Sequence, residues 1–115
     1  MTCRISLTEW NGRRVLHMEG PDFLPQQQSE VRSMAKSLLE SPSASPVLID
    51  TTGLGLVGSC CLAALIEVGM SCRKMGTPCG IIESRSDILE VFDIVSLHSI
   101  LPVFPSKEDA SAHGV

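Results

Sequence analysis

Positive charge is scarce in this 115-residue chain, and no long hydrophobic run is present. Nine lysines and arginines stand against thirteen acidic residues, so the net charge is −4 at pH 7. Proteins that bind nucleic acid neutralise phosphates with a basic surface, so we expect no nucleic-acid partner. The longest apolar-leaning stretch, 54–70, contains a serine and a glutamate and is too short to span a bilayer. The first ten residues lack the pattern of a secretory signal. We therefore expect a cytoplasmic protein without direct membrane insertion.

Paired cysteine motifs are missing as well. The five cysteines are odd in number and none are spaced as Cys-x-x-Cys; they are Cys3, Cys60, Cys61, Cys72 and Cys79. This argues against a disulfide framework and against a structural zinc site. No carboxylate or cysteine stands at ligand spacing from the histidines, which are His17, His98 and His113. Ser59 lacks the G-x-S-x-G context of a hydrolase nucleophile. We expect no metal site and no catalytic residue.

The first half of the chain predicts a hairpin followed by a helix. Residues 3–9 and 13–18 alternate apolar and polar side chains, and Asn11-Gly12 between them suits a type I′ turn. Pro25 suits the first turn of a helix. The apolar face of that helix repeats at helical spacing and consists of Val31, Met34, Ala35, Leu38 and Leu39. A loop rich in serine and proline, 41–46, ends it.

The second half alternates short strands with helices. Buried strands are predicted at 47–49 and 79–83, a helix at 59–74 between them, and a last strand at 101–104. Ser84 and Asp87 resemble a capping box, and the inner face of the helix it opens consists of Ile88, Val91, Phe92 and Val95. The polar tail, 106–115, is expected to fray. With 43% apolar residues, the chain predicts a single α/β domain over 1–115, a mixed sheet with helices packed against it.

A glycine-rich loop, 53–58, fits the pattern G-x-G-x-x-G between a predicted strand and a predicted helix. Such a loop can hold the pyrophosphate of a dinucleotide at the start of the helix. Three polar residues, 50–52, separate the glycines from the strand, and the acidic residue expected at the end of the next strand is misplaced. The chain also has too few βαβ units for two mononucleotide halves. We expect no cofactor.

The predicted helix at 59–74 has two unlike faces. At about 100° per residue, one side gathers Leu62, Leu65, Ile66 and Gly69, and the opposite side gathers Cys60, Ala63, Ala64, Glu67, Ser71 and Lys74. Small outward side chains let the backbone of another protein approach closely, but an ordinary alanine-rich surface has the same pattern. The start of a helix favours an anion. A hydroxyl there could accept a phosphoryl group that the helix tolerates and a docked partner does not.

Two segments carry a family resemblance. Residues 49–62 (Ile-Asp-Thr-Thr-Gly-Leu-Gly-Leu-Val-Gly-Ser-Cys-Cys-Leu) resemble the central signature of STAS domains, in which Asp-Ser-Ser-Gly-Leu opens a helix after a strand. Residues 84–104, which include Val-Phe-Asp-Ile-Val-Ser-Leu at 91–97 and Pro-Val-Phe at 102–104, are similar to a second block of that family. The resemblance implies the STAS fold: a mixed sheet of four to five strands with an N-terminal hairpin, and three to four helices mainly on one face.

The resemblance further implies an anti-sigma factor antagonist that works by partner switching. Such a protein, when unphosphorylated, binds an anti-sigma factor kinase; phosphorylation ends the binding and a PP2C-type phosphatase restores it. Catalysis belongs to the partners, so we expect a regulatory binding module, not an enzyme, present as a monomer or weak homodimer. The residues expected to bind the partner are Asp22, Phe23, Asp50, Thr51, Thr52, Gly58, Ser59, Cys60, Ala63, Ala64 and Glu67.

The sequence departs from the family pattern at the phosphoacceptor. The family's Asp falls on Gly58, its first Ser on Ser59, its phosphoacceptor on Cys60 and its Gly on Cys61. A thiol is not a normal substrate of a serine/threonine kinase. Three interpretations stay open: Ser59 as substitute acceptor, constitutive binding, or redox control through Cys60. Two alternative functions are also open. The protein is either an accessory subunit of a larger complex, such as a membrane transporter, or a small nucleotide- or lipid-binding protein.

Overall fold

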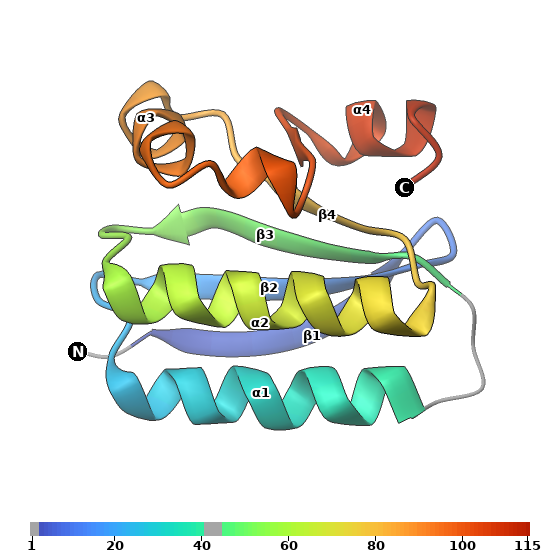
Figure 1. Cartoon of the computed structure of the whole chain (residues 1–115), viewed down its shortest axis with the longest axis horizontal. Coiled ribbons are helices and arrows are strands. Elements are labelled where there is room, and N and C mark those ends of the chain that lie inside the picture. The colour runs from blue at the N-terminus through green and yellow to red at the C-terminus, as the bar shows by residue number, and fades with distance from the viewer. Residues whose placement is uncertain (1–2, 41–44) are drawn as a thin grey trace.

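The computed structural model describes residues 3–40 and 45–115, where a five-stranded sheet carries four α-helices and one 3-10 helix (Figure 1). The strands lie in the order β1-β2-β3-β4-β5; β1 is antiparallel to β2, and the other neighbours are parallel. Most of the loop expected at 41–46 lies outside the described residues. The elements are β1 (Arg4–Trp10), β2 (Arg13–Gly20), α1 (Pro25–Glu40), β3 (Val47–Leu54), α2 (Ser59–Met75), β4 (Cys79–Ile82), α3 (Ser86–Ile94), η1 (Leu97–Ser99), β5 (Val103–Phe104) and α4 (Lys107–Ala112).

The expected fold class is confirmed, beginning with the hairpin. Asn11 and Gly12 have φ of 48° and 75°. Both values are positive, as a type I′ turn requires, and asparagine and glycine are the residues that adopt them at least cost. The turn sets the register in which Leu7 pairs with Leu16.

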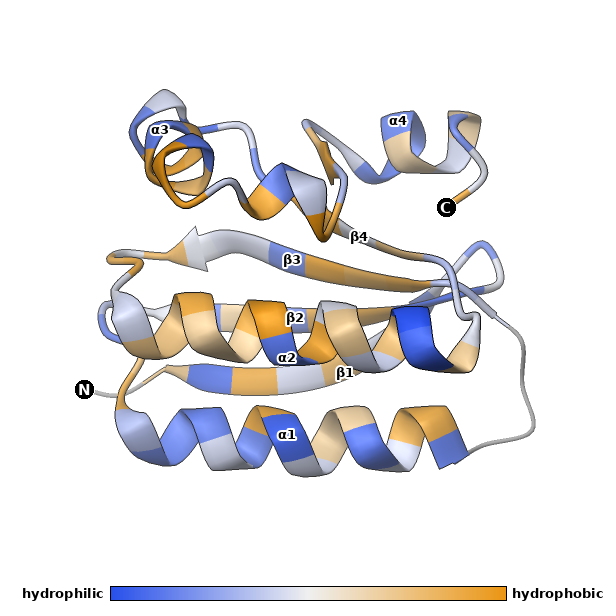
Figure 2. Cartoon of the chain, viewed as in Figure 1, coloured by the Kyte–Doolittle hydropathy of each residue, from blue (hydrophilic) through white to orange (hydrophobic). Residues whose placement is uncertain are grey.

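The main core lies between the sheet and the α1–α2 layer. The parallel crossovers β2-α1-β3 and β3-α2-β4 place both helices on one face, where Figure 1 shows them side by side. Leu16, Ile49, Leu65 and Ile81 are fully buried in this core. In Figure 2 the first part of β3 is coloured hydrophobic, and many turns of α1 are coloured hydrophilic. Removing each such side chain from water stabilises the fold by about 2 kcal/mol.

The C-terminal tail differs from the expectation that it frays. It forms α4, whose N-cap Ser106 accepts a hydrogen bond from the Asp109 amide at 3.1 Å. Ala110 is fully buried in a second cluster on the other face of the sheet, with Val15 and Leu48. A short polar segment therefore folds because the sheet offers it an apolar face to cover.

The start of α3 also differs from the prediction. The N-cap is Arg85, and its side chain makes no capping hydrogen bond, so Ser84 and Asp87 do not form the expected capping box. Ile88 and Phe92 point into the main core as predicted. Val95 lies after the end of α3 and is 42% exposed, so it was wrongly assigned to the inner face.

Candidate partner-binding surface

The loop from β3 to α2 is held against the end of the hairpin through backbone contacts. The Gly55 amide donates to the Gly20 carbonyl at 2.9 Å, and the Leu56 amide donates to the Pro21 carbonyl at 3.1 Å. A Cβ on Gly55 would lie 2.9 Å from the Pro21 oxygen, closer than real Cβ atoms come. Gly53 packs as closely on β2. Close packing of the loop on Pro21 therefore accounts for Gly55, and close packing of β3 on β2 accounts for Gly53.

This packing brings the segment after the hairpin beside the loop that leads into α2. The Asp22 carbonyl accepts a hydrogen bond from the Cys3 amide at 2.9 Å, which fixes the backbone, and the Asp22 side chain is exposed. Phe23 is only 9% exposed and belongs to the main core. Of the two residues expected here at the partner surface, only Asp22 presents its side chain to solvent.

A buried ion pair anchors the same loop from the other side. The Glu83 side chain is fully buried, and Arg85 Nη2 and Nε donate to its two carboxylate oxygens at 2.8 and 3.0 Å. Arg85 also donates to the carbonyls of Thr51, at 2.8 Å, and Leu54. The guanidinium therefore ties the end of β4 to the end of β3 and to the loop leading into α2. We call Glu83, Arg85 and Thr51 the arginine clamp.

The electrostatics of the arginine clamp favour the charged carboxylate. Burial raises the pKa of the Glu83 carboxyl, but hydrogen bonds from Arg85 and Thr51 outweigh it and hold the pKa below its ordinary value. Neither Glu83 nor Arg85 is among the residues that the sequence predicts for the site. The sequence pattern that could have indicated the pair is an acidic residue at the end of a buried strand, followed two positions later by an arginine.

Thr51 was wrongly placed at the partner surface. Its side chain is fully buried, and its hydroxyl lies 2.8 Å from Glu83 Oε1 and 3.1 Å from the Ile82 carbonyl oxygen. The hydroxyl is occupied within the arginine clamp and faces away from solvent. Its neighbour Thr52 is exposed, and the Thr52 amide donates to Asp50 Oδ1 at 3.0 Å.

Asp50 lies on the sheet face that α1 and α2 leave free. Its Oδ2 is 3.3 Å from His17 Nδ1, and His17 Nε2 is 2.8 Å from the hydroxyl of Thr8. A polar chain thus crosses three neighbouring strands. The Asp50 side chain is 17% exposed, so most of its surface faces these partners.

The start of α2 is open to solvent. Its N-cap, Gly58, is exposed, has extended backbone angles and provides no side-chain acceptor, and no acidic residue lies in the first turn. Ser59 is exposed as the first helical residue, and Cys60, which the sequence resemblance aligns with the family's phosphoacceptor, is half-buried. The positive end of the helix dipole therefore meets solvent without a neighbouring carboxylate from its own cap.

The adjacent cysteines occupy different environments. Cys61 is fully buried in the main core, and burial raises the pKa of its thiol to about 12. The thiolate is the reactive form of cysteine, so Cys61 is inert at neutral pH. Cys60 alone of the two reaches the surface.

The face of α2 that is buried differs from the face that the sequence predicts to be buried. Ala64, expected outside, is fully buried, and Leu65 and Gly69 are buried as expected. The complete buried stripe is Cys61, Ala64, Leu65, Val68, Gly69 and Cys72. Ala64 cannot contact a partner in the folded protein. The outward stripe includes Ser59, Ala63 and Met70, with Ala63 half-buried.

Glu67 lies at the edge of α2 that faces α1. Its carboxylate accepts hydrogen bonds from Arg32 Nη2 at 2.8 Å and Nε at 3.1 Å, and from Gln28 Nε2 at 3.4 Å. The Arg32 hydrogen bonds lower the pKa of Glu67. A side chain that was expected to point at a partner is therefore engaged within the protein, with 39% of its surface still exposed.

Large apolar side chains are exposed on the loop before α2, on α2 itself and on α3. Leu56 in the loop is 65% exposed, Met70 on α2 is 59% exposed, and Ile94 at the end of α3 is 78% exposed. Exposed apolar side chains of this size add contact area for another protein.

No helix among residues 3–40 and 45–115 is both long and apolar enough to cross a membrane. Within the same described part, no three histidine, cysteine or acidic side chains gather in a way that could hold a metal ion.

The fold and this loop define the class of protein. The chain matches the STAS domain family over residues 4–110 and belongs to that family. The match includes the hairpin, the loop before α2 and α3, the elements in which the sequence resemblance lay.

Individual relatives are more distant. An anti-sigma-F factor antagonist of Mycobacterium tuberculosis, RsfA, is 20% identical over 96 residues, which are 84% of this chain and 75% of the relative. A candidate anti-anti-sigma factor of the same species, Rv2638, is 28% identical over 69 residues, which are 60% of this chain and only 47% of the relative. The crystal structure of an anti-sigma factor antagonist from Mycobacterium paratuberculosis superposes with a TM-score of 0.75 at 16% identity, covering 96% of this chain and 92% of that one.

Proposed function

We propose that this protein is a non-catalytic anti-sigma factor antagonist, and that its partner is an anti-sigma factor. The observation that carries the proposal is the exposed start of α2, where Gly58 has no side chain and Ser59 and the half-buried Ala63 have small ones. The arginine clamp and the loop contacts to Gly20 and Pro21 hold this start in one place. A preorganised, side-chain-poor surface costs little entropy on binding. The names of the relatives support the same function.

We propose that the partner is bound constitutively, without partner switching by phosphorylation. The matched acceptor position holds Cys60, which a serine/threonine kinase does not phosphorylate. The second case is phosphorylation of Ser59 in place of Cys60, since the exposure of Ser59 makes it accessible to a kinase. A PP2C-type phosphatase has a role only in that second case. The two cases differ in whether incubation with the anti-sigma factor and ATP adds a phosphoryl mass to the chain.

The test is capture of the partner by the immobilised full chain, with identification by mass spectrometry. Ala63→Arg places a bulky charge on the outward stripe and is expected to abolish capture of the anti-sigma factor while the protein stays folded. Ser29→Arg puts the same side chain on an exposed position of α1 and serves as the matched control. Thermal unfolding of both variants verifies the fold.

The outcomes separate the candidate functions. Capture of an anti-sigma factor that is lost in Ala63→Arg and kept in Ser29→Arg supports the proposal. Capture of a membrane transporter through the same face supports an accessory subunit instead. Equal capture by Ala63→Arg and the unmodified chain would refute the proposed surface.

A further inference from the structure

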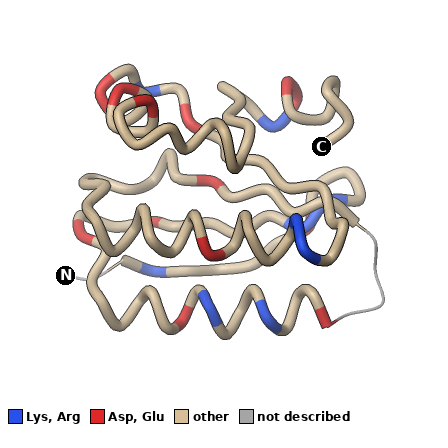
Figure 3. Tube along the Cα trace, viewed as in Figure 1, with Lys and Arg blue, Asp and Glu red and all other residues tan. Residues whose placement is uncertain are grey.

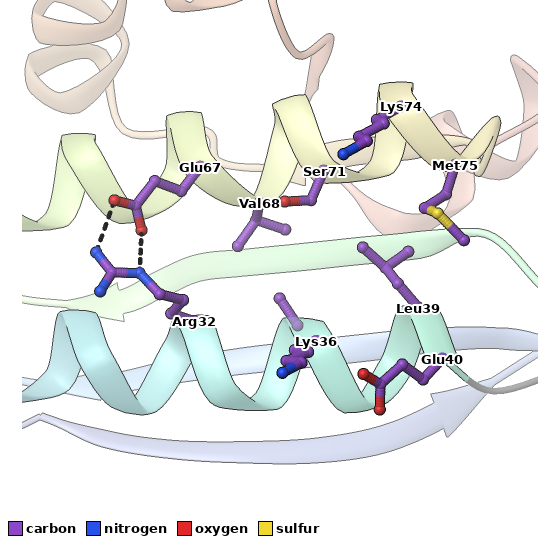
Figure 4. Close-up of a pocket in the computed structure, with 10 residues that line it drawn as sticks. Arg32, Lys36, Leu39, Glu40, Glu67, Val68, Ser71, Lys74 and Met75 are labelled. Carbon is purple, nitrogen blue, oxygen red and sulfur yellow. Dashed lines mark hydrogen bonds and ion pairs between the residues drawn. The ribbon is translucent and has the colours of Figure 1, made fainter.

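A groove of about 360 Å³ runs between α1 and α2, toward the ends of the two helices and away from the proposed partner surface. Figure 4 shows Leu39 of α1 and Val68 and Met75 of α2 with their side chains pointing into it. Ala35 lines it as well. Small-molecule sites in proteins have volumes of roughly 300–1,000 Å³ and mainly apolar linings. The groove fits the lower part of that range.

The apolar wall of the groove is incompletely covered. Met75 is 58% exposed beside the end of α2, although a large thioether side chain is normally buried. Leu39 is half-buried. An apolar ligand lying on these side chains would remove their surface from water, which is favourable in proportion to the area covered.

The charges around the groove leave positive charge free. Arg32 and Glu67 neutralise each other at one end, where Figure 4 shows their paired hydrogen bonds. Lys36 and Lys74, one from each helix, also line the groove; within the described residues neither makes an ion pair or hydrogen bond. In the described part of the chain, Glu40 is the one lining carboxylate besides Glu67. Two free lysines against one glutamate give a local positive excess in a chain of net charge −4. Figure 3 shows basic residues on both helices.

We propose that this groove binds a small anionic amphiphile, a medium-chain carboxylate. Its carbon chain lies over Leu39 and Met75, with Val68, only 2% exposed, at the floor of the groove. Its carboxylate is held by Lys36 and Lys74. Among the described residues no aromatic side chain lines the groove, so these residues give a nucleotide base nothing to stack on. The aliphatic lining and the two ammonium groups match an aliphatic chain with one anionic end. The site is independent of the proposed anti-sigma factor surface at the start of α2.

The test is titration of the full chain with decanoate below its micelle concentration, followed by heteronuclear NMR. We expect saturable shifts of the Leu39, Val68 and Met75 signals. Lys36→Glu and Lys74→Glu are each expected to weaken decanoate binding roughly tenfold, because each turns an attraction into a repulsion. Lys107→Glu changes the one remaining lysine, on α4, and is the matched control, with affinity unchanged.

Two further ligands test the contributions of the carbon chain and of the negative charge separately. Decanol, which has the chain without the carboxylate, and inorganic phosphate, which has charge without the chain, are each expected to bind at least tenfold more weakly than decanoate. Ser71→Phe fills the groove and keeps both lysines, and is expected to abolish binding. Equal affinity for decanol, or equal loss in Lys107→Glu, would overturn the proposal. Binding to vesicles of phosphatidylglycerol without binding to free decanoate would overturn it too.

Discussion

Replacing Arg85 by alanine tests whether the arginine clamp holds the loop before α2. In the folded protein Glu83 accepts hydrogen bonds from the Arg85 side chain, the Ser84 amide at 3.0 Å, the Arg85 amide at 3.1 Å and the Thr51 hydroxyl. Arg85→Ala removes the only cation paired with this carboxylate in the described part of the chain. It also removes donors from the carbonyls of Thr51 and Leu54.

The expected loss is about 3 kcal/mol of unfolding free energy. Removing one partner of a buried ion pair costs about 3–5 kcal/mol, because the other charge is left buried and unpaired. The lower end applies here, since 34% of the Arg85 side chain is exposed and the carboxylate keeps two backbone donors. With a urea m-value of about 1.5 kcal/mol per molar, the unfolding midpoint falls by about 2 M.

The assay is urea unfolding followed by the fluorescence of Trp10, the single tryptophan. The control is Arg4→Ala, which removes an arginine whose side chain is 82% exposed and whose ion pair with Glu19 measures 3.5 Å. An exposed pair of this kind contributes at most about 1 kcal/mol. If Arg85→Ala lowers the unfolding free energy no more than Arg4→Ala does, Arg85 does not anchor the loop.

The lowered pKa of Glu83 fixes how its contribution to the unfolding free energy changes with pH. Because the pKa of Glu83 is lowered by folding, its contribution is fully present above the unfolded-state pKa of about 4.3 and is lost as pH falls through the folded-state value. Arg85→Ala leaves burial as the dominant influence and raises that pKa. The gap in unfolding free energy between the two proteins therefore narrows as pH is lowered from 7 toward 4. A gap that stays constant over this range would contradict the assignment.

Three other changes test separate parts of the structure. Gly69→Ala would put a Cβ 2.6 Å from the buried Leu101 side chain, so a loss of about 1–2 kcal/mol in thermal unfolding is expected despite the better helix propensity. Gly58→Asp supplies the missing cap of α2 in open space and should raise the unfolding free energy by about 1 kcal/mol; a lower melting temperature would refute the cap geometry. Iodoacetamide at neutral pH should alkylate Cys60 well before Cys61, as peptide mass spectrometry would detect, and the reverse order would contradict the burial of Cys61.

Local patterns predicted the elements because each rests on near neighbours. The backbone preferences of Asn11 and Gly12 predict the turn, and apolar side chains at helical spacing predict α1. The tail from Ser106 onward was misjudged because its helix of six residues depends on burying Ala110 against the sheet. A contact between segments this far apart leaves no local pattern.

The candidate site was found only in part for the same reason. The loop before α2 and the open start of the helix follow from the motif at 49–62, and the structure brings Asp22 beside them. The Glu83–Arg85 pair belongs to another strand, and nothing near either residue in the sequence says that they reach the carbonyls of Thr51 and Leu54.

The sequence by itself determined the order of the strands and α-helices as far as β5, and the position of the loop that opens α2. Only the tertiary structure decided which face of α2 is buried: its buried stripe lies about 80° around the helix axis from the predicted one. Small side chains such as Ala64 and Cys61 carry almost no hydrophobic signal, yet they are the ones that fit where a helix packs closely on a sheet. The phase of such a helix is set by the shape of the surface that it covers.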